Sequence, residues 1–236
     1  MNAPTPAVPP GTGASALAPP GPLTPKARWA LGLAVALTVV YVLLDVLAQL
    51  LPPHYSPITQ AESDLAVGPF GYVMTINFVV RGVLSLSFLG GLAAATSIRR
   101  RSPVGMALVA IWGVGAFVLA ASPTDLGDES TLHGMIHLAS AALAFVTAAV
   151  GEVLLSLRFR DEPRLASFRT PALLLSVLAV LALLVLFYVE QRPRLSAEAF
   201  GLVERVFLGL VLLWMLIVAL YLLRSDRRAS VRRTEA

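Results

Sequence analysis

The stretch that decides the fold is WALGLAVALTVVYVLLDVLAQLL, residues 29–51, in which Asp45 is the one charged side chain. A helix needs about 20 consecutive apolar residues to cross the hydrocarbon core of a bilayer, and this run is longer than that. It is also longer than the apolar region of a secretory signal, and its basic residues, Lys26 and Arg28, lie directly before it. We therefore expect the segment to remain in the membrane as a span.

Five further apolar runs repeat this pattern along the chain. Backbone amides in lipid must be satisfied within their own segment, so each run is expected to be a helix. Of the 236 residues, 57% are hydrophobic and 14% are charged, and the mean hydropathy is +0.78. Soluble domains are about 45–50% apolar, so a water-soluble fold is excluded. The sequence predicts an all-α bundle of six transmembrane helices, with the later five at 71–97, 103–121, 132–157, 170–189 and 200–223.

The two ends of the chain differ from the middle in composition. Residues 1–25 contain eight prolines among Ala, Gly and Thr, which predicts a disordered cytoplasmic tail. Residues 26–225 form the predicted transmembrane domain, and residues 226–236 form a basic cytoplasmic tail. The absence of cysteine excludes disulfides, thiol nucleophiles and iron–sulfur clusters.

The distribution of charge predicts the orientation. A net charge of +4 would suggest nucleic acid as a partner of a soluble protein, but here the arginines cluster on every second connector and at the C-terminus. By the positive-inside rule, connectors 98–102 and 158–169 and both termini are cytoplasmic. The acidic connectors 52–70, 122–131 and 190–199 then face outward. We expect a multi-pass protein of a bacterial inner membrane, with the lipid bilayer rather than nucleic acid as its partner.

A few polar side chains interrupt the apolar runs. Ionisable groups in lipid are costly unless they are paired or hydrated, so each is a candidate for function. Arg81 falls near the centre of the second run, and Asp45 is its best partner by depth, as a buried ion pair between the first two helices. The predicted pocket and ion-pair network, facing outward, consists of Asp45, Asn77, Arg81, Glu204 and Arg205.

His133 and His137 open the fourth run one helical turn apart. Two such histidines can bind one metal ion, but a site needs a third ligand, and the pair is more often a set of hydrogen-bonded interior histidines. Asp125 is our choice of third ligand, with His54, Asp64 and Asp128 as alternatives, and Zn²⁺ is the cofactor that such a site would take. Ser63, Asp64 and Asp125 are the candidate catalytic residues.

These motifs carry a family resemblance. In order and spacing the chain resembles the bacterial and archaeal multi-pass proteins of domain-of-unknown-function family 998, over about Tyr41 to Leu223. That family has no established activity, and the resemblance implies a compact six-helix module whose motifs coincide with the polar cluster. The residues concerned are Ser63-Asp64-Leu65, Asn77-Phe78, Arg81-Gly82, Pro123-Thr124-Asp125, His133 to His137, Glu204-Arg205 and Trp214.

Three functions fit the polar cluster. In the first, it is a structural network of an accessory membrane protein. In the second, His133 and His137 serve an intramembrane metal-dependent hydrolase of a lipid-like substrate, similar in its Ser, Asp and HxxxH residues to the seven-helix ceramidase and adiponectin-receptor group. In the third, charges at similar depth serve a transporter or a proton-coupled binder of a lipid or small molecule.

Overall fold

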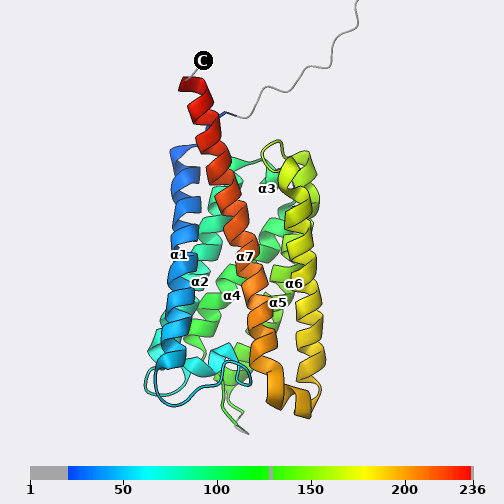
Figure 1. Cartoon of the computed structure of the whole chain (residues 1–236). Coiled ribbons are helices and arrows are strands. Elements are labelled where there is room, and N and C mark those ends of the chain that lie inside the picture. The colour runs from blue at the N-terminus through cyan, green and yellow to red at the C-terminus, as the bar shows by residue number, and fades with distance from the viewer. Residues whose placement is uncertain (1–20, 128–129, 235–236) are drawn as a thin grey trace, which may run out of the picture.

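The computed structural model describes residues 21–127 and 130–234 of the chain and shows a bundle of long helices (Figure 1). Six of the helices are long and apolar enough to cross a membrane, and the described residues contain no strand. The predicted all-α, six-helix transmembrane fold is therefore confirmed. The six helices are α1 (Pro25–Leu50), α2 (Gly71–Ala95), α4 (Pro103–Ala121), α5 (Leu132–Arg158), α6 (Arg169–Glu190) and α7 (Pro193–Thr234).

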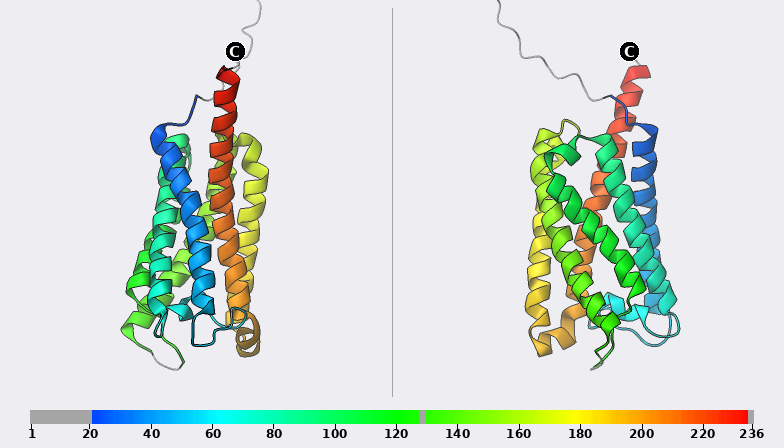
Figure 2. Two further views of the ribbon diagram at one scale, coloured as in Figure 1. Left: turned by 60° about the vertical axis from the view of Figure 1, so that its left-hand side comes forward. Right: turned by 180° about the vertical axis from the view of Figure 1, so that it is seen from behind.

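The helices run up and down, so that the connectors alternate between two ends of the bundle. The start of α1 and the end of α7 lie together at one end, which we call the terminal end (Figures 1 and 2). The short helices α3 (Ile98–Arg101), η2 (Phe159–Asp161) and η3 (Ala166–Phe168) also belong to that end. The opposite end carries the 3-10 helix η1 (Glu62–Ala66), and we call it the η1 end.

Helix α7 departs most from its predicted bounds. It begins at Pro193 rather than residue 200, so residues 191 and 192 alone separate it from α6. Proline at a first helical position fits this early start, because its missing N–H would have no intrahelical partner there. At its other end α7 runs to Thr234, past the predicted boundary at residue 225. Most of the predicted tail 1–25, namely residues 1–20, lies outside the described residues, as does Asp128.

Polar anchors fix the terminal end. Asp226 of α7 accepts a hydrogen bond from the backbone N–H of Leu23 at 2.6 Å and pairs with Arg28 Nε at 2.8 Å. Glu162 accepts from the backbone N–H of Ser97 and pairs with Arg101 Nε at 3.2 Å. Both carboxylates are buried, so these contacts join segments that are distant in the sequence and close this end of the bundle.

Candidate functional site

The connector after α1 is folded back onto α7. The Arg205 guanidinium donates to the carbonyls of Pro57 and Gln60, at 3.2 Å each, and to the hydroxyl of Tyr55 at 2.6 Å. Gly201 lies one turn earlier on α7, where a Cβ atom would collide with the Pro57 and Gln60 carbonyls. Burial is the main cause that raises the pKa of the Tyr55 hydroxyl, which therefore stays protonated. The connector is thus held against the helix by polar contacts and close packing.

These contacts between the connector and α7 place Glu62, the first residue of η1, inside the bundle. Its backbone N–H donates to Glu204 Oε2 at 2.6 Å, and its carboxylate accepts a hydrogen bond from the Tyr41 hydroxyl. Glu62 is only 3% exposed. One connector residue therefore joins α1, η1 and α7.

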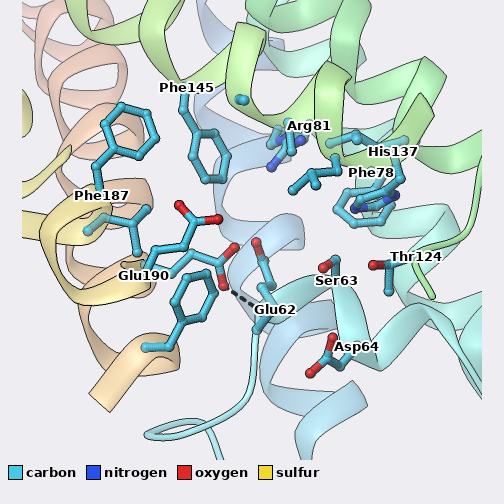
Figure 3. A pocket seen from close by; sticks show the side chains of 18 residues that line it. Glu62, Ser63, Asp64, Phe78, Arg81, Thr124, His137, Phe145, Phe187 and Glu190 are labelled. Carbon is cyan, nitrogen blue, oxygen red and sulfur yellow. Dashed lines mark hydrogen bonds between the residues drawn. The ribbon is translucent and has the colours of Figure 1, made fainter. Parts of the chain in front are cut away.

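A cavity of about 170 Å³ lies beneath η1 (Figure 3). Its wall combines residues of α2, α5, α6, α7 and η1. The polar part includes Arg81, His137, Glu204 and Glu190, and the apolar part includes several phenylalanines. An apolar cavity of about 150 Å³ admits benzene, so this one has room for a ligand or headgroup of several heavy atoms.

Arg81 of α2 is the most unusual residue of this wall. It is 1% exposed, and neither Nε nor Nη2 has a hydrogen-bond partner among the described residues. Its guanidinium carbon lies 4.4 Å from the centre of the Trp112 ring and 5.2 Å from that of Phe78, which are cation–π distances. No ion pair joins Arg81 to a carboxylate within residues 21–127 and 130–234. Aromatic rings thus hold a buried cation that has two unpartnered nitrogens among the described residues.

Four carboxyl groups line the same cavity. Glu62 and Glu204 are buried, whereas Glu190 is at the exposed end of α6 and Asp64 is in η1. Burial raises the pKa of Asp64, opposed by a backbone hydrogen bond at Ala61 and by the Arg205 charge. None of the four forms an ion pair with a described residue. The wall therefore has an excess of acidic groups over its single arginine.

The two histidines of the HxxxH motif have different surroundings. His137 is buried and lines the cavity, and its Nδ1 lies 2.7 Å from the Ser122 carbonyl. Because a carbonyl oxygen only accepts, Nδ1 carries a proton and donates this hydrogen bond. His133 is exposed and does not line the cavity.

The third predicted metal ligand, Asp125, binds Thr131, the N-cap residue of α5. Its carboxylate accepts hydrogen bonds from the backbone N–H and the hydroxyl of Thr131, both at 2.7 Å, just before α5 begins. In the part of the chain that the structure describes, no three His, Asp or Glu side chains are placed to share a metal ion. The geometry therefore gives the zinc hypothesis no support.

Of the other candidate catalytic residues, Ser63 and Asp64 do line the cavity (Figure 3). A serine nucleophile needs a base within hydrogen-bond reach. No hydrogen bond joins the Ser63 hydroxyl to His137 or Asp64 among the described residues. The residues line a pocket but do not form a nucleophile and base pair.

The structure separates Asp45 from Arg81. Asp45 lines a groove between α1 and α7 and accepts a hydrogen bond from Gln49 at 2.7 Å, while its Oδ1 has no partner. The expected Asp45–Arg81 ion pair is not formed.

The other residues of the predicted network lie in different surroundings. Asn77 is fully buried, its Oδ1 has no partner among the described residues, and it does not line the cavity. Glu204 and Arg205 diverge, since Glu204 enters the cavity and Arg205 holds the connector.

Sequence reasoning missed the role of Glu62 and Glu190. Both lie in predicted connectors, where an acidic residue is ordinarily solvated, and hydropathy gives no signal that the chain folds back. Glu62 lines both the cavity and the α1–α7 groove, so it is the residue that the two share.

Comparison with known proteins adds a family but no activity. No match was found among curated proteins or among solved structures. One family model covers residues 31–221, which includes most or all of α1, α2, α4, α5 and α6, the larger part of α7 and all the residues of the cavity. The chain belongs to the family described as "Protein of unknown function (DUF998)".

Proposed function

We propose that this multi-pass membrane protein is a binding protein for a small ligand or lipid headgroup that carries an anionic group, and that Arg81 holds that group in the cavity. The observation that carries the proposal is that Arg81 lines the cavity while its Nε and Nη2 have no hydrogen-bond partner among the described residues. Removing an arginine from water costs several kcal/mol unless it is compensated, and such groups in membrane proteins mark binding or transport sites.

This arrangement favours binding over a purely structural role. In a structural network each member satisfies another, as Asp226 and Arg28 do at the terminal end. Arg81 instead has two nitrogens without a partner among the described residues, and its guanidinium carbon lies over the Trp112 ring. A guanidinium presents paired N–H groups that match carboxylate and phosphate oxygens. An anionic ligand would therefore supply the hydrogen-bond acceptors that the described residues do not provide.

We further propose that the η1 end faces outward from a bacterial inner membrane. The arginine-rich connectors and the C-terminal end of α7 are all at the terminal end, which the positive-inside rule assigns to the cytoplasm. Because the chain has no cysteine, Ser130→Cys at the η1 end and Ala166→Cys at the terminal end are clean probes. A membrane-impermeant maleimide should label the first and not the second in intact cells, and the reverse pattern would contradict the proposal.

The binding proposal is tested by the fluorescence of Trp112, whose ring contacts the Arg81 guanidinium. The full chain in nanodiscs is titrated with propionate, β-alanine and O-phosphoethanolamine at constant ionic strength. At least one probe should change the fluorescence in a saturable way, and Arg81→Gln or Trp112→Phe should abolish the change. Arg194→Gln, which removes an exposed charge at the same end, is the matched control and should leave it intact. No saturable response to any probe would overturn the proposal.

A further inference from the structure

The cavity contains more than a site for an anion. Across from Arg81 lies Glu62, which comes from a different element and points toward the same space (Figure 3). Glu204 Oε2 accepts a hydrogen bond from the backbone N–H of Glu62 at 2.6 Å, and Glu204 belongs to the same wall. Within residues 21–127 and 130–234, the cavity is thus bordered by one arginine and by a group of carboxyl groups, none of which forms an ion pair.

A ligand of one charge would satisfy only half of this arrangement. A simple anion at Arg81 would meet repulsion from Glu62, Glu204 and Glu190, and a simple cation at the carboxylates would leave Arg81 unpartnered. Both penalties grow as water is excluded, because charges interact more strongly at a lower dielectric constant. A ligand with both charges avoids each of them.

The apolar wall fits the cationic end of such a ligand. Phe145, Phe187 and Phe200 line the cavity together with Glu190 and Glu204. Ammonium groups bind favourably over the faces of aromatic rings, especially when they are desolvated. The carboxylates and these rings therefore form a surface suited to an ammonium group.

The geometry points to a zwitterionic ligand, whose carboxylate or phosphate binds Arg81 and whose ammonium group binds Glu62, Glu204 and Glu190. This inference rests on the proposed binding function and specifies its ligand class. The cavity of about 170 Å³ has room for an amino-acid-sized molecule or for an aminoalkyl phosphate headgroup.

The test compares two probes that differ by a single ammonium group. Propionate and β-alanine are titrated against the full chain in phosphatidylglycerol nanodiscs, with Trp112 fluorescence as the readout. β-Alanine should bind at least about tenfold more tightly, which corresponds to a modest charge interaction in a partly dry site. Equal affinity for the two probes would overturn the zwitterion inference while leaving the binding proposal intact. Failure of both probes and of O-phosphoethanolamine would overturn the binding proposal itself.

Substitutions of the carboxylates give a result that a folding defect does not produce. Glu204→Gln and Glu190→Gln should weaken β-alanine binding and at the same time strengthen propionate binding, because each removes an attraction for the amine and a repulsion of the anion. Glu190 is exposed and makes no hydrogen bond to a described residue, so its substitution is the safer one for folding. Glu198→Gln, an exposed acid on the same end, is the control that should change neither affinity. Parallel changes for both probes would contradict the inference.

A lipid headgroup and a free zwitterion share this chemistry, and a second pair of nanodiscs distinguishes them. Glu62 also lines the groove between α1 and α7, which lies within membrane-spanning helices. If a headgroup is the natural ligand, the phosphatidylethanolamine headgroup should occupy the cavity in nanodiscs of that lipid and lower the apparent affinity for β-alanine. If the ligand is a free molecule, the affinity should be the same in both lipids. Either result supports the zwitterion class and identifies its source.

Discussion

The guanidinium carbon of Arg81 lies 4.4 Å from the centre of the Trp112 ring, and two nitrogens of that guanidinium have no hydrogen-bond partner in the described part of the chain. A cation–π contact contributes about 0.5–2 kcal/mol, whereas an uncompensated charge in a membrane interior costs more than that. The contact with the ring therefore positions the arginine but does not offset the free-energy cost of its burial. The remaining cost is what an anionic ligand would offset.

This imbalance predicts that Arg81 destabilises the ligand-free protein. Arg81→Met should raise the free energy of unfolding by about 1–3 kcal/mol, because it removes an uncompensated buried charge and keeps a long apolar side chain. Arg81→Lys keeps the charge and should give no such gain. Chemical unfolding of the full chain in detergent measures both variants, and a destabilised Arg81→Met would show that the arginine has a partner in the resting protein.

The second prediction concerns the hydrogen bond from Tyr41 to Glu62. Tyr41→Phe removes that donor and leaves a buried carboxylate without it. Because hydrogen bonds to charged groups contribute about 1.5–3 kcal/mol, the unfolding free energy should fall by that amount. Tyr72→Phe is the control, since Tyr72 is 60% exposed, and it should change stability by less than about 0.5 kcal/mol. Equal effects of the two substitutions would contradict the importance of this contact.

Two glycines on α7 provide a matched pair for the third prediction. A Cβ atom at Gly201 would lie 2.8 Å from the Pro57 carbonyl oxygen and also overlap that of Gln60, whereas nothing lies within 4 Å of one at Gly209. Gly201→Ala should therefore displace the connector, destabilise the protein and weaken ligand binding through Glu62. Gly209→Ala should stabilise the protein by about 0.5–1 kcal/mol, as alanine does in a helix. Thermal unfolding and the Trp112 titration measure both variants, and similar results for the two would show that the connector does not rest on α7 at Gly201.

The fourth prediction is a pH dependence at Asp125. Hydrogen bonds from Thr131 lower the pKa of this carboxyl below its ordinary value of 3.8. A lowered pKa in the folded state adds stability above the unfolded value, and that stability is lost as the pH falls through the folded value. Asp125→Ala should therefore lower the melting temperature at neutral pH, and the difference from the natural chain should shrink below pH 3.8. A difference that stays constant through this range would show that the charge is not involved.

The sequence was sufficient to predict the helices but not how they face one another. Hydropathy located all six spans, because the cost of exposed backbone in lipid leaves few alternatives. It also singled out Arg81 and Glu204, since charges within apolar runs are rare. It did not predict that Asp45 faces the α1–α7 groove instead of Arg81, because the rotation of each helix is set by packing. Nor did it predict Glu62, whose burial depends on contacts between a connector and a distant helix.

A cryo-EM density map of the full chain in phosphatidylglycerol nanodiscs with saturating β-alanine would show whether the cavity holds a zwitterion. We expect ligand density in the cavity, with the carboxylate against the Arg81 guanidinium and the amine toward Glu62 and Glu204. A map in which Arg81 pairs directly with one of these glutamates, with no ligand between them, would contradict this expectation.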